Sequence, residues 1–149
     1  MEPVTVTRVA TFDTTVEELW AHLATEAGLA GWLGHAVELD VALGAAGRLV
    51  DGDGNNRRLV VSELAEGSSL GFVWWDESDP AIASAVSLAL DEVDGQARLT
   101  VTETLDASLG AAAGGGRICD VVEAGQDTSE RWGLRLGLLA ERAGLLVSV

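Results

Sequence analysis

The last part of the chain has the spacing of a long amphipathic helix. Trp132, Leu136 and Leu139 recur at intervals of four and three residues, which places them in one stripe along a helix. We therefore predict a helix over residues 127–146, with Asp127 as its N-cap. A helix of this length spans about 30 Å, roughly the diameter of a small domain. Its apolar stripe has to be buried, so the rest of the chain must supply a surface that covers it.

Strand patterns separated by turn residues precede this helix. Residues 4–13 alternate in the period of a strand, and a short amphipathic helix capped by Thr14 is expected to follow. The short connections predict hairpins and hence an antiparallel sheet. We predict a single α+β domain over residues 1–149, in which a curved antiparallel sheet wraps around the C-terminal helix and short helices follow the first strand. The later strands are expected at 36–41, 47–50, 58–64, 70–76, 84–93 and 98–104.

Residues 107–126 form a segment rich in glycine and alanine. Glycine raises the entropic cost of ordering a segment, whereas alanine can cover an apolar opening. We therefore expect this segment to act as a mobile gate next to the sheet.

The charge balance excludes several classes of partner. All nine basic residues are arginine, and 24 carboxylates outnumber them, giving a net charge of -15. Because no basic stripe is available to neutralise phosphates, we expect neither nucleic acid nor a membrane surface as a partner. The N-terminus shows no secretory pattern, and Cys119 is a lone thiol. We expect a cytoplasmic protein that is a monomer or a homodimer.

Five segments occur in an order that is typical of one superfamily. They are 13–23 (DTTVEELWAHL), 29–34 (LAGWLG), 43–49 (LGAAGRL), 70–74 (LGFVW) and 131–136 (RWGLRL). Together they resemble the SRPBCC or START-like superfamily, the helix-grip or Bet v-like fold, and in particular its activator-of-heat-shock-ATPase and polyketide-cyclase-like branches. This resemblance implies a cavity between the sheet and the last helix.

The candidate ligand-binding residues are those expected to face that cavity. Strand parity places Phe72 and Trp74 on one face, and Glu103 continues the parity of Val101 into the interior. Tryptophan rings suit either core packing or the wall of a cavity, and a buried carboxylate requires partners. We predict that a small, mainly hydrophobic or amphipathic molecule binds there. The predicted binding residues are Trp32, His35, Phe72, Trp74, Leu88, Val101, Glu103, Trp132 and Leu136.

Two alternatives stay open at this stage. An enzyme of the cyclase, dehydratase or hydrolase kind would use Glu103 or Asp76 together with His35, but no arrangement of nucleophile, base and orienting group is visible, so we assign no catalytic residue. A protein-interaction module is the other alternative, as the co-chaperone-like branch suggests.

Neither a metal nor a cofactor is expected. His22 and His35 lack a third ligand at suitable spacing. The stretch 51–55 (DGDGN) begins like a calcium-binding loop, but Asn56 and Ser62 occupy the positions that require glycine and glutamate. We interpret this stretch as a hairpin turn.

Overall fold

The computed structural model describes residues 4–105, 121–144 and 147–148. Its helices are α1 (Val16–Leu23), α2 (Glu26–Leu29) and α4 (Val121–Ala143). Its strands are β1 (Val4–Phe12), β2 (His35–Glu38), β3 (Ala46–Val50), β4 (Asn56–Ala65), β5 (Ser69–Asp76), β6 (Asp79–Val93), β7 (Gln96–Leu105) and β8 (Val147–Ser148).

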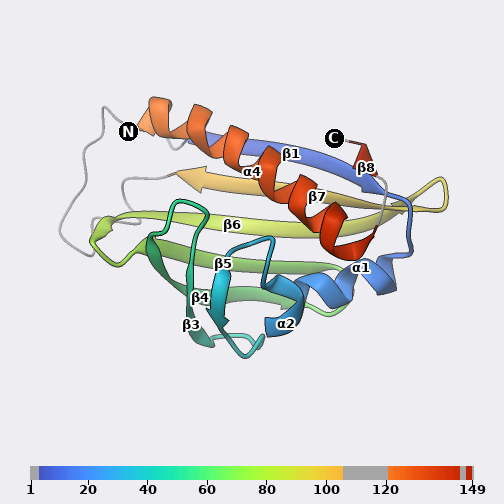
Figure 1. Cartoon of the computed structure of the whole chain (residues 1–149), viewed down its shortest axis with the longest axis horizontal. Helices are drawn as coiled ribbons and strands as arrows, with labels where there is room; N and C mark the ends of the chain where they lie inside the picture. Colours follow the sequence, from blue (N-terminus) through green and yellow to red (C-terminus); the bar gives the residue numbers. More distant parts are fainter. Residues whose placement is uncertain (1–3, 106–120, 145–146, 149) are drawn as a thin grey trace.

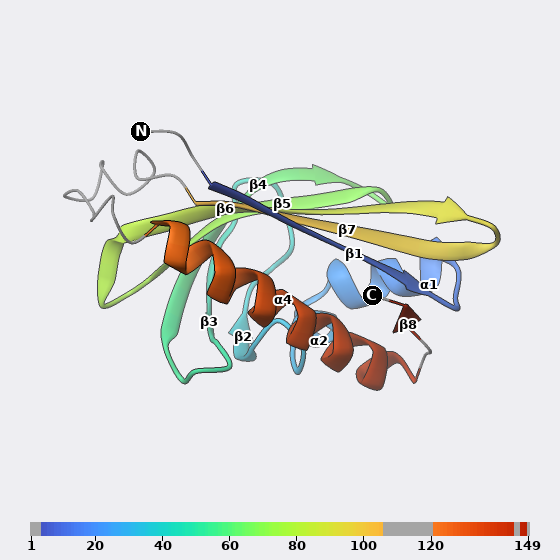
Figure 2. The same cartoon turned by 90° about the horizontal axis from the view of Figure 1, so that it is seen from above.

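The strands form one antiparallel sheet in the order β2-β3-β4-β5-β6-β7-β1-β8. Register shifts interrupt the β2–β3, β4–β5 and β5–β6 pairings, and such irregularities bend strands. Helix α4 crosses one face of this curved sheet, and α1 and α2 lie on the same side (Figures 1 and 2). The predicted α+β helix-grip architecture is confirmed.

Two predicted strands differ from the structure by three residues or more at one end. Strand β6 begins at Asp79, five residues or so before the expected start, because the tight β5–β6 connection already pairs Asp79 with Asp76. Strand β2 ends at Glu38, after a positive φ of 50° at Ala36 that disturbs the pairing with β3. The short β8, which pairs with β1, carries no pattern that predicts it.

The cap of α1 is shifted by one residue from the prediction. Thr15, in an extended conformation, accepts a hydrogen bond from the Glu18 backbone N–H at 3.2 Å. Thr14 instead donates its hydroxyl to the Glu18 carboxylate. Both threonines therefore help to begin the helix, but Thr15 is the N-cap.

Helix α4 begins at Val121 rather than at Asp127 and ends at Ala143 rather than near residue 146. Gly144 follows it with a φ of 66°, the left-handed conformation that commonly ends a helix. The expected gate at 107–126 therefore contributes its last residues to α4, and residues 106–120 lie outside the described part of the chain. No helix in the described ranges combines the length and the apolar character that crossing a bilayer requires.

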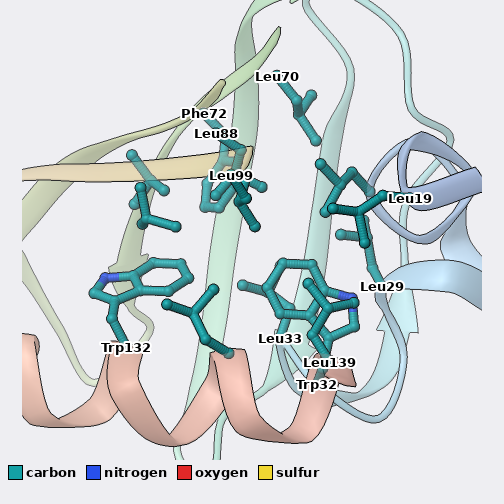
Figure 3. Packing of buried hydrophobic residues seen from close by; sticks show 14 of the residues in the cluster. Leu19, Leu29, Trp32, Leu33, Leu70, Phe72, Leu88, Leu99, Trp132 and Leu139 are labelled. Carbon is teal, nitrogen blue, oxygen red and sulfur yellow. The ribbon is translucent and has the colours of Figure 1, made fainter. Parts of the chain in front are cut away.

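The core lies between α4 and the sheet. Trp132, Leu136 and Leu139 are fully buried, as the predicted stripe requires. Figure 3 shows Trp132 on α4 pointing toward Phe72 and Leu88 of the sheet. Burial of large apolar side chains on one helix face is the main stabilising contribution that such an arrangement offers.

Trp32 anchors the turn between α2 and β2. Its indole N–H donates to the carbonyl oxygens of His22 at 3.0 Å and Gly28 at 2.9 Å, while its ring is buried. In Figure 3, Trp32 and Leu33 lie beside Leu139 of α4. This packing fixes the segment that leads into β2 against the helix.

Candidate functional site

A groove of about 700 Å³ lies between α4 and two connecting segments of the chain. One segment is 31–35, which enters β2, and the other is the turn between β3 and β4, represented by Gly52 and Asp53. The third side consists of α4 residues between Arg131 and Glu141. Because the groove is bounded by elements that are distant in the sequence, its shape depends on how α4 is docked.

The helix side of the groove carries two exposed leucines beside its charged side chains. Leu134 is 71% exposed and Leu138 is 43% exposed, although both are leucines on a helix whose other leucines are buried. Between them, a Cβ added to Gly137 would meet no heavy atom within 4 Å, so this glycine leaves a recess. Exposed apolar side chains around a recess are a feature of binding surfaces.

Arg135 lies at the base of the groove and is only 8% exposed. Its guanidinium carbon is 5.0 Å from the ring centroid of Trp74 and 4.7 Å from that of Trp132, so the cation contacts both indoles. Burial lowers the pKa of Arg135 to about 10, and the negative charge of Glu103 opposes this shift only in part. At neutral pH the guanidinium remains a positive charge in a poorly hydrated position.

The two indoles under Arg135 are stacked and share one carboxylate. The rings of Trp74 and Trp132 are 6.1 Å apart with an interplanar angle of 26°. Trp132 donates its indole N–H to Oε1 of Glu103 at 2.8 Å, and Trp74 donates to Oε2 at 2.8 Å. The hydroxyl of Ser84 also donates to Oε2. Both oxygens of this buried carboxylate are therefore occupied by protein donors.

Strand pairing explains why these groups meet. Trp74 on β5 is opposite Ser84 on β6, and Val86 on β6 is opposite Glu103 on β7. Residues two apart on a strand share a face, so all three polar groups point to the same side of the sheet. Trp132 reaches the same carboxylate from α4.

A second buried carboxylate, Asp51, organises the β3–β4 turn. Its Oδ1 accepts the backbone N–H groups of Asp53 and Asn55 at 3.0 Å each, and its Oδ2 accepts from Arg57 at 2.8 Å. Burial raises the pKa of Asp51, but Arg57 and the two backbone donors together bring the pKa below its ordinary value. The predicted hairpin turn is present, and Asp51 stabilises it through these three hydrogen bonds.

Charged residues connect this turn to the groove and to the indoles. The Arg57 guanidinium carbon lies 4.4 Å from the Trp74 ring centroid. Asp53 forms an ion pair with Arg131 of α4 at 3.0 Å, and both of these side chains are about half exposed. The turn is thus joined to α4 at the rim of the groove, while Arg57 contacts the cluster beneath it.

The predicted site residues fall into separate environments. Trp32 and the exposed His35 line the groove. Trp74, Trp132 and Glu103 form the buried cluster beneath Arg135, so the stacked indoles occupy the space between sheet and helix where a cavity was expected. The remaining predicted residues belong to the core and are Phe72, Leu88, Val101 and Leu136.

Asp76, which the catalytic alternative considered, lies apart from the groove. Asp76 accepts hydrogen bonds from the backbone N–H and the hydroxyl of Ser78 in the β5–β6 connection, away from the groove. Cys119 lies outside the described residues. Within the described ranges, no three His, Cys, Asp or Glu side chains are grouped so that they could hold a metal ion.

The sequence did not lead us to Arg135 or Arg57, and it indicated Asp51 only as the start of a hairpin turn. Arg135 follows Trp132 by three residues, which puts the two on neighbouring rows of a helix, and this spacing was an available signal. Asp51 begins a turn, and an aspartate in this position can accept hydrogen bonds from backbone N–H groups later in the turn. This local pattern was a second available signal. Nothing in the local sequence indicates that Arg57 and Arg135 approach the same indole.

Comparisons with known proteins agree with this architecture. The model of the family described as Activator of Hsp90 ATPase homolog 1-like protein matches residues 13–141. A protein from Mesorhizobium loti is 20% identical, with a TM-score of 0.71 over 94% of this chain and 95% of its own. The Aha1 dimer from Colwellia psychrerythraea is 14% identical, with a TM-score of 0.68 over 89% and 90% of the two chains.

A further structure, an HSP90 activator from Plasmodium falciparum, is 17% identical, with a TM-score of 0.67 over 97% of this chain and 99% of its own. At these identities, the structural likeness establishes the fold and not the activity. No match was found among the curated proteins.

Proposed function

We propose that this chain, which belongs to the Activator of Hsp90 ATPase homolog 1-like family, binds a small, mainly apolar molecule in the groove beside α4. The family and its fold support ligand-binding, cyclase-like and co-chaperone-like roles in general. The observation that favours ligand binding is an apolar recess above a buried arginine.

The size and lining of the groove suit a small molecule. A volume of about 700 Å³ falls within the range of about 300 to 1,000 Å³ that is usual for ligand pockets. Leu134 and Leu138 supply apolar contact, and the space beside Gly137 lets a ligand approach the helix backbone closely. Leaving two leucines exposed costs the protein burial energy that a bound apolar group would recover.

The catalytic alternative gains no support from the two carboxylates considered for it. Glu103 is occupied by Trp74, Trp132 and Ser84, and it does not line the groove. A general acid or base has to reach the reacting atom of a substrate directly or through one water molecule. Neither Glu103 nor Asp76 lines the groove, so neither carboxylate considered for catalysis is placed to act on a molecule bound there.

The proposal is tested by titrating the protein with Nile red, a neutral apolar dye whose emission rises in apolar surroundings. We expect saturable binding that weakens in Leu134→Ser, which removes apolar wall, and in Gly137→Leu, which fills the recess. Leu43→Ser is the matched control, because Leu43 is a leucine of nearly equal exposure, 68%, that lies in the connection before β3 and does not line the groove.

The variants separate the groove from other apolar surfaces. If the dye binds equally well to all of them, it occupies another surface and the proposed site is wrong. If wild-type protein shows no saturable binding, and native mass spectrometry finds no co-purified small molecule, the interaction alternative with Leu134 and Leu138 as contact residues becomes the better explanation.

A further inference from the structure

We infer that the ligand of this groove carries an anionic oxygen group, of which a carboxylate is the simplest form, and that this group pairs with Arg135 while an apolar body lies along Leu134 and Leu138. This inference rests on the proposed function and specifies its ligand class. It follows from the surroundings of Arg135 rather than from the apolar wall.

Arg135 is a buried cation without a close carboxylate among the described residues. Among the described side chains, those of residues 4–79, 83–105 and 128–144, the ion pairs within 4.0 Å involve other arginines, and no hydrogen bond joins Arg135 to an acidic side chain. Its described contacts are the faces of Trp74 and Trp132. A buried guanidinium in this position gains more from an incoming anion than a hydrated arginine would.

The neighbouring carboxylates already have partners. Glu103 accepts from two indoles and a hydroxyl, and Asp51 accepts from Arg57 and two backbone N–H groups. Asp53 pairs with Arg131 at the rim. A shift of any of these carboxylates toward Arg135 would leave other buried or paired donors without an acceptor.

The other charges in the groove do not cancel this preference. Asp53 and Glu141 also line it, but the Asp53 side chain is 52% exposed and Glu141 is exposed, whereas Arg135 is 8% exposed. The effective dielectric constant falls from about 80 in water to about 20 near protein, so a charge at the base acts about fourfold more strongly than one in solvent. The net charge of -15 is largely screened beyond about 8 Å at physiological ionic strength.

The arrangement also restrains the guanidinium. Its position over both rings limits the conformations of a long side chain that would otherwise lose entropy on binding. Arginine presents a planar fork that matches the two oxygens of a carboxylate better than an ammonium group does. The pair of stacked indoles thus serves as a platform that holds the fork ready at the base of the groove.

The inference is tested with three probes that share one apolar body: 4-butylbenzoate, 4-butylbenzamide and 4-butylbenzylamine, titrated by calorimetry at pH 7. We expect the benzoate to bind about tenfold or more tightly than the neutral amide, since hydrogen bonds to charged groups are stronger by that order, and the cationic amine to bind most weakly. Binding of the benzoate should also change tryptophan emission, because Arg135 contacts Trp74 and Trp132.

Variants then assign the preference to Arg135. Arg135→Gln should bring benzoate and amide to equal affinity, whereas Arg135→Lys should retain part of the difference because the charge remains. Arg48→Gln is the control, since Arg48 pairs with Glu38 at 2.7 Å and does not line the groove. If Arg135→Gln does not fold, as judged by circular dichroism, the order of the three probes on the native protein still decides the question.

The outcomes distinguish this inference from the proposed function. Equal binding of the three probes, lost in Gly137→Leu, would overturn the anionic group and leave the apolar groove intact. A preference for benzoate that persists in Arg135→Gln would overturn the role of Arg135. Failure of all three probes to bind would count against both the inference and the proposed function.

Discussion

Replacing Glu103 by glutamine should destabilise the protein strongly, although the two side chains have nearly the same shape. Glu103 is 3% exposed, and its two oxygens accept from Trp132 and Trp74 at 2.8 Å each, with Ser84 as a third donor. A glutamine has one oxygen and one NH₂ group, so one indole N–H faces another N–H whichever way the amide is turned. An NH₂ group at the Oε1 position leaves the Trp132 N–H without its acceptor, whereas at the Oε2 position it leaves Trp74 with only the Ser84 hydroxyl at 3.0 Å.

Two contributions set the magnitude of this effect. An unsatisfied buried donor costs about 1 to 3 kcal/mol. The substitution also removes the negative charge of Glu103, which partly offsets the lowering of the Arg135 pKa by burial without forming an ion pair with it, so the guanidinium loses a favourable interaction as well. The unsatisfied donor sets the scale, and we expect a loss of about 1 to 3 kcal/mol in the free energy of unfolding.

Urea unfolding monitored by tryptophan emission and by far-ultraviolet circular dichroism measures this loss. Glu38→Gln is the control, because the Glu38 side chain is 63% exposed and pairs with Arg48 on the surface, where little change is expected. The double variant of Glu103→Gln with Arg135→Met should be less destabilised than the sum of the single variants, since it also removes the uncompensated cation. A loss below about 1 kcal/mol for Glu103→Gln would refute the reasoning.

Two further variants test other parts of the structure. Gly137→Ala should stabilise the protein by up to about 1 kcal/mol in urea unfolding, because alanine favours a helix and its Cβ enters open space; destabilisation would mean that the recess is filled. Asp51→Asn should make the melting temperature fall less steeply as the pH is lowered. The folded pKa of Asp51 is below the ordinary value of 3.8, so its contribution is present above that pH and is lost as the pH falls through the folded pKa. Melting temperatures measured between about pH 5 and pH 2 check this slope, and an unchanged slope would contradict the assigned role.

Local periodicity was sufficient to predict the inward faces of the fold. Trp132, Leu136 and Leu139 follow the helical repeat, and Trp74 and Glu103 follow strand parity, so each face could be assigned from neighbouring residues alone. The hairpin at Asp51 was likewise predicted from turn residues. In these cases, residues that are close in the sequence determine the direction of the side chains and the conformation of the turn.

Element ends were less well determined by the sequence. The start of α4 at Val121 and the early start of β6 at Asp79 depend on pairing and docking as well as on propensity. The polar residue Asp127 resembled a cap, yet the helix continues through it. Local preferences of this kind are weak, so tertiary contacts can override them.

Only the tertiary structure decided what surrounds the indoles. The sequence by itself determined that Trp74, Glu103 and Trp132 face the interior, but not that they bond to one another, because a carboxylate on β7 meets an indole on α4 only after the helix docks on the sheet. The same docking buries Arg135 against Trp74 and forms the groove that Arg135 lines. Periodicity specifies the direction of a side chain relative to its own element, whereas a binding site depends on distances between elements that are fixed by the whole fold.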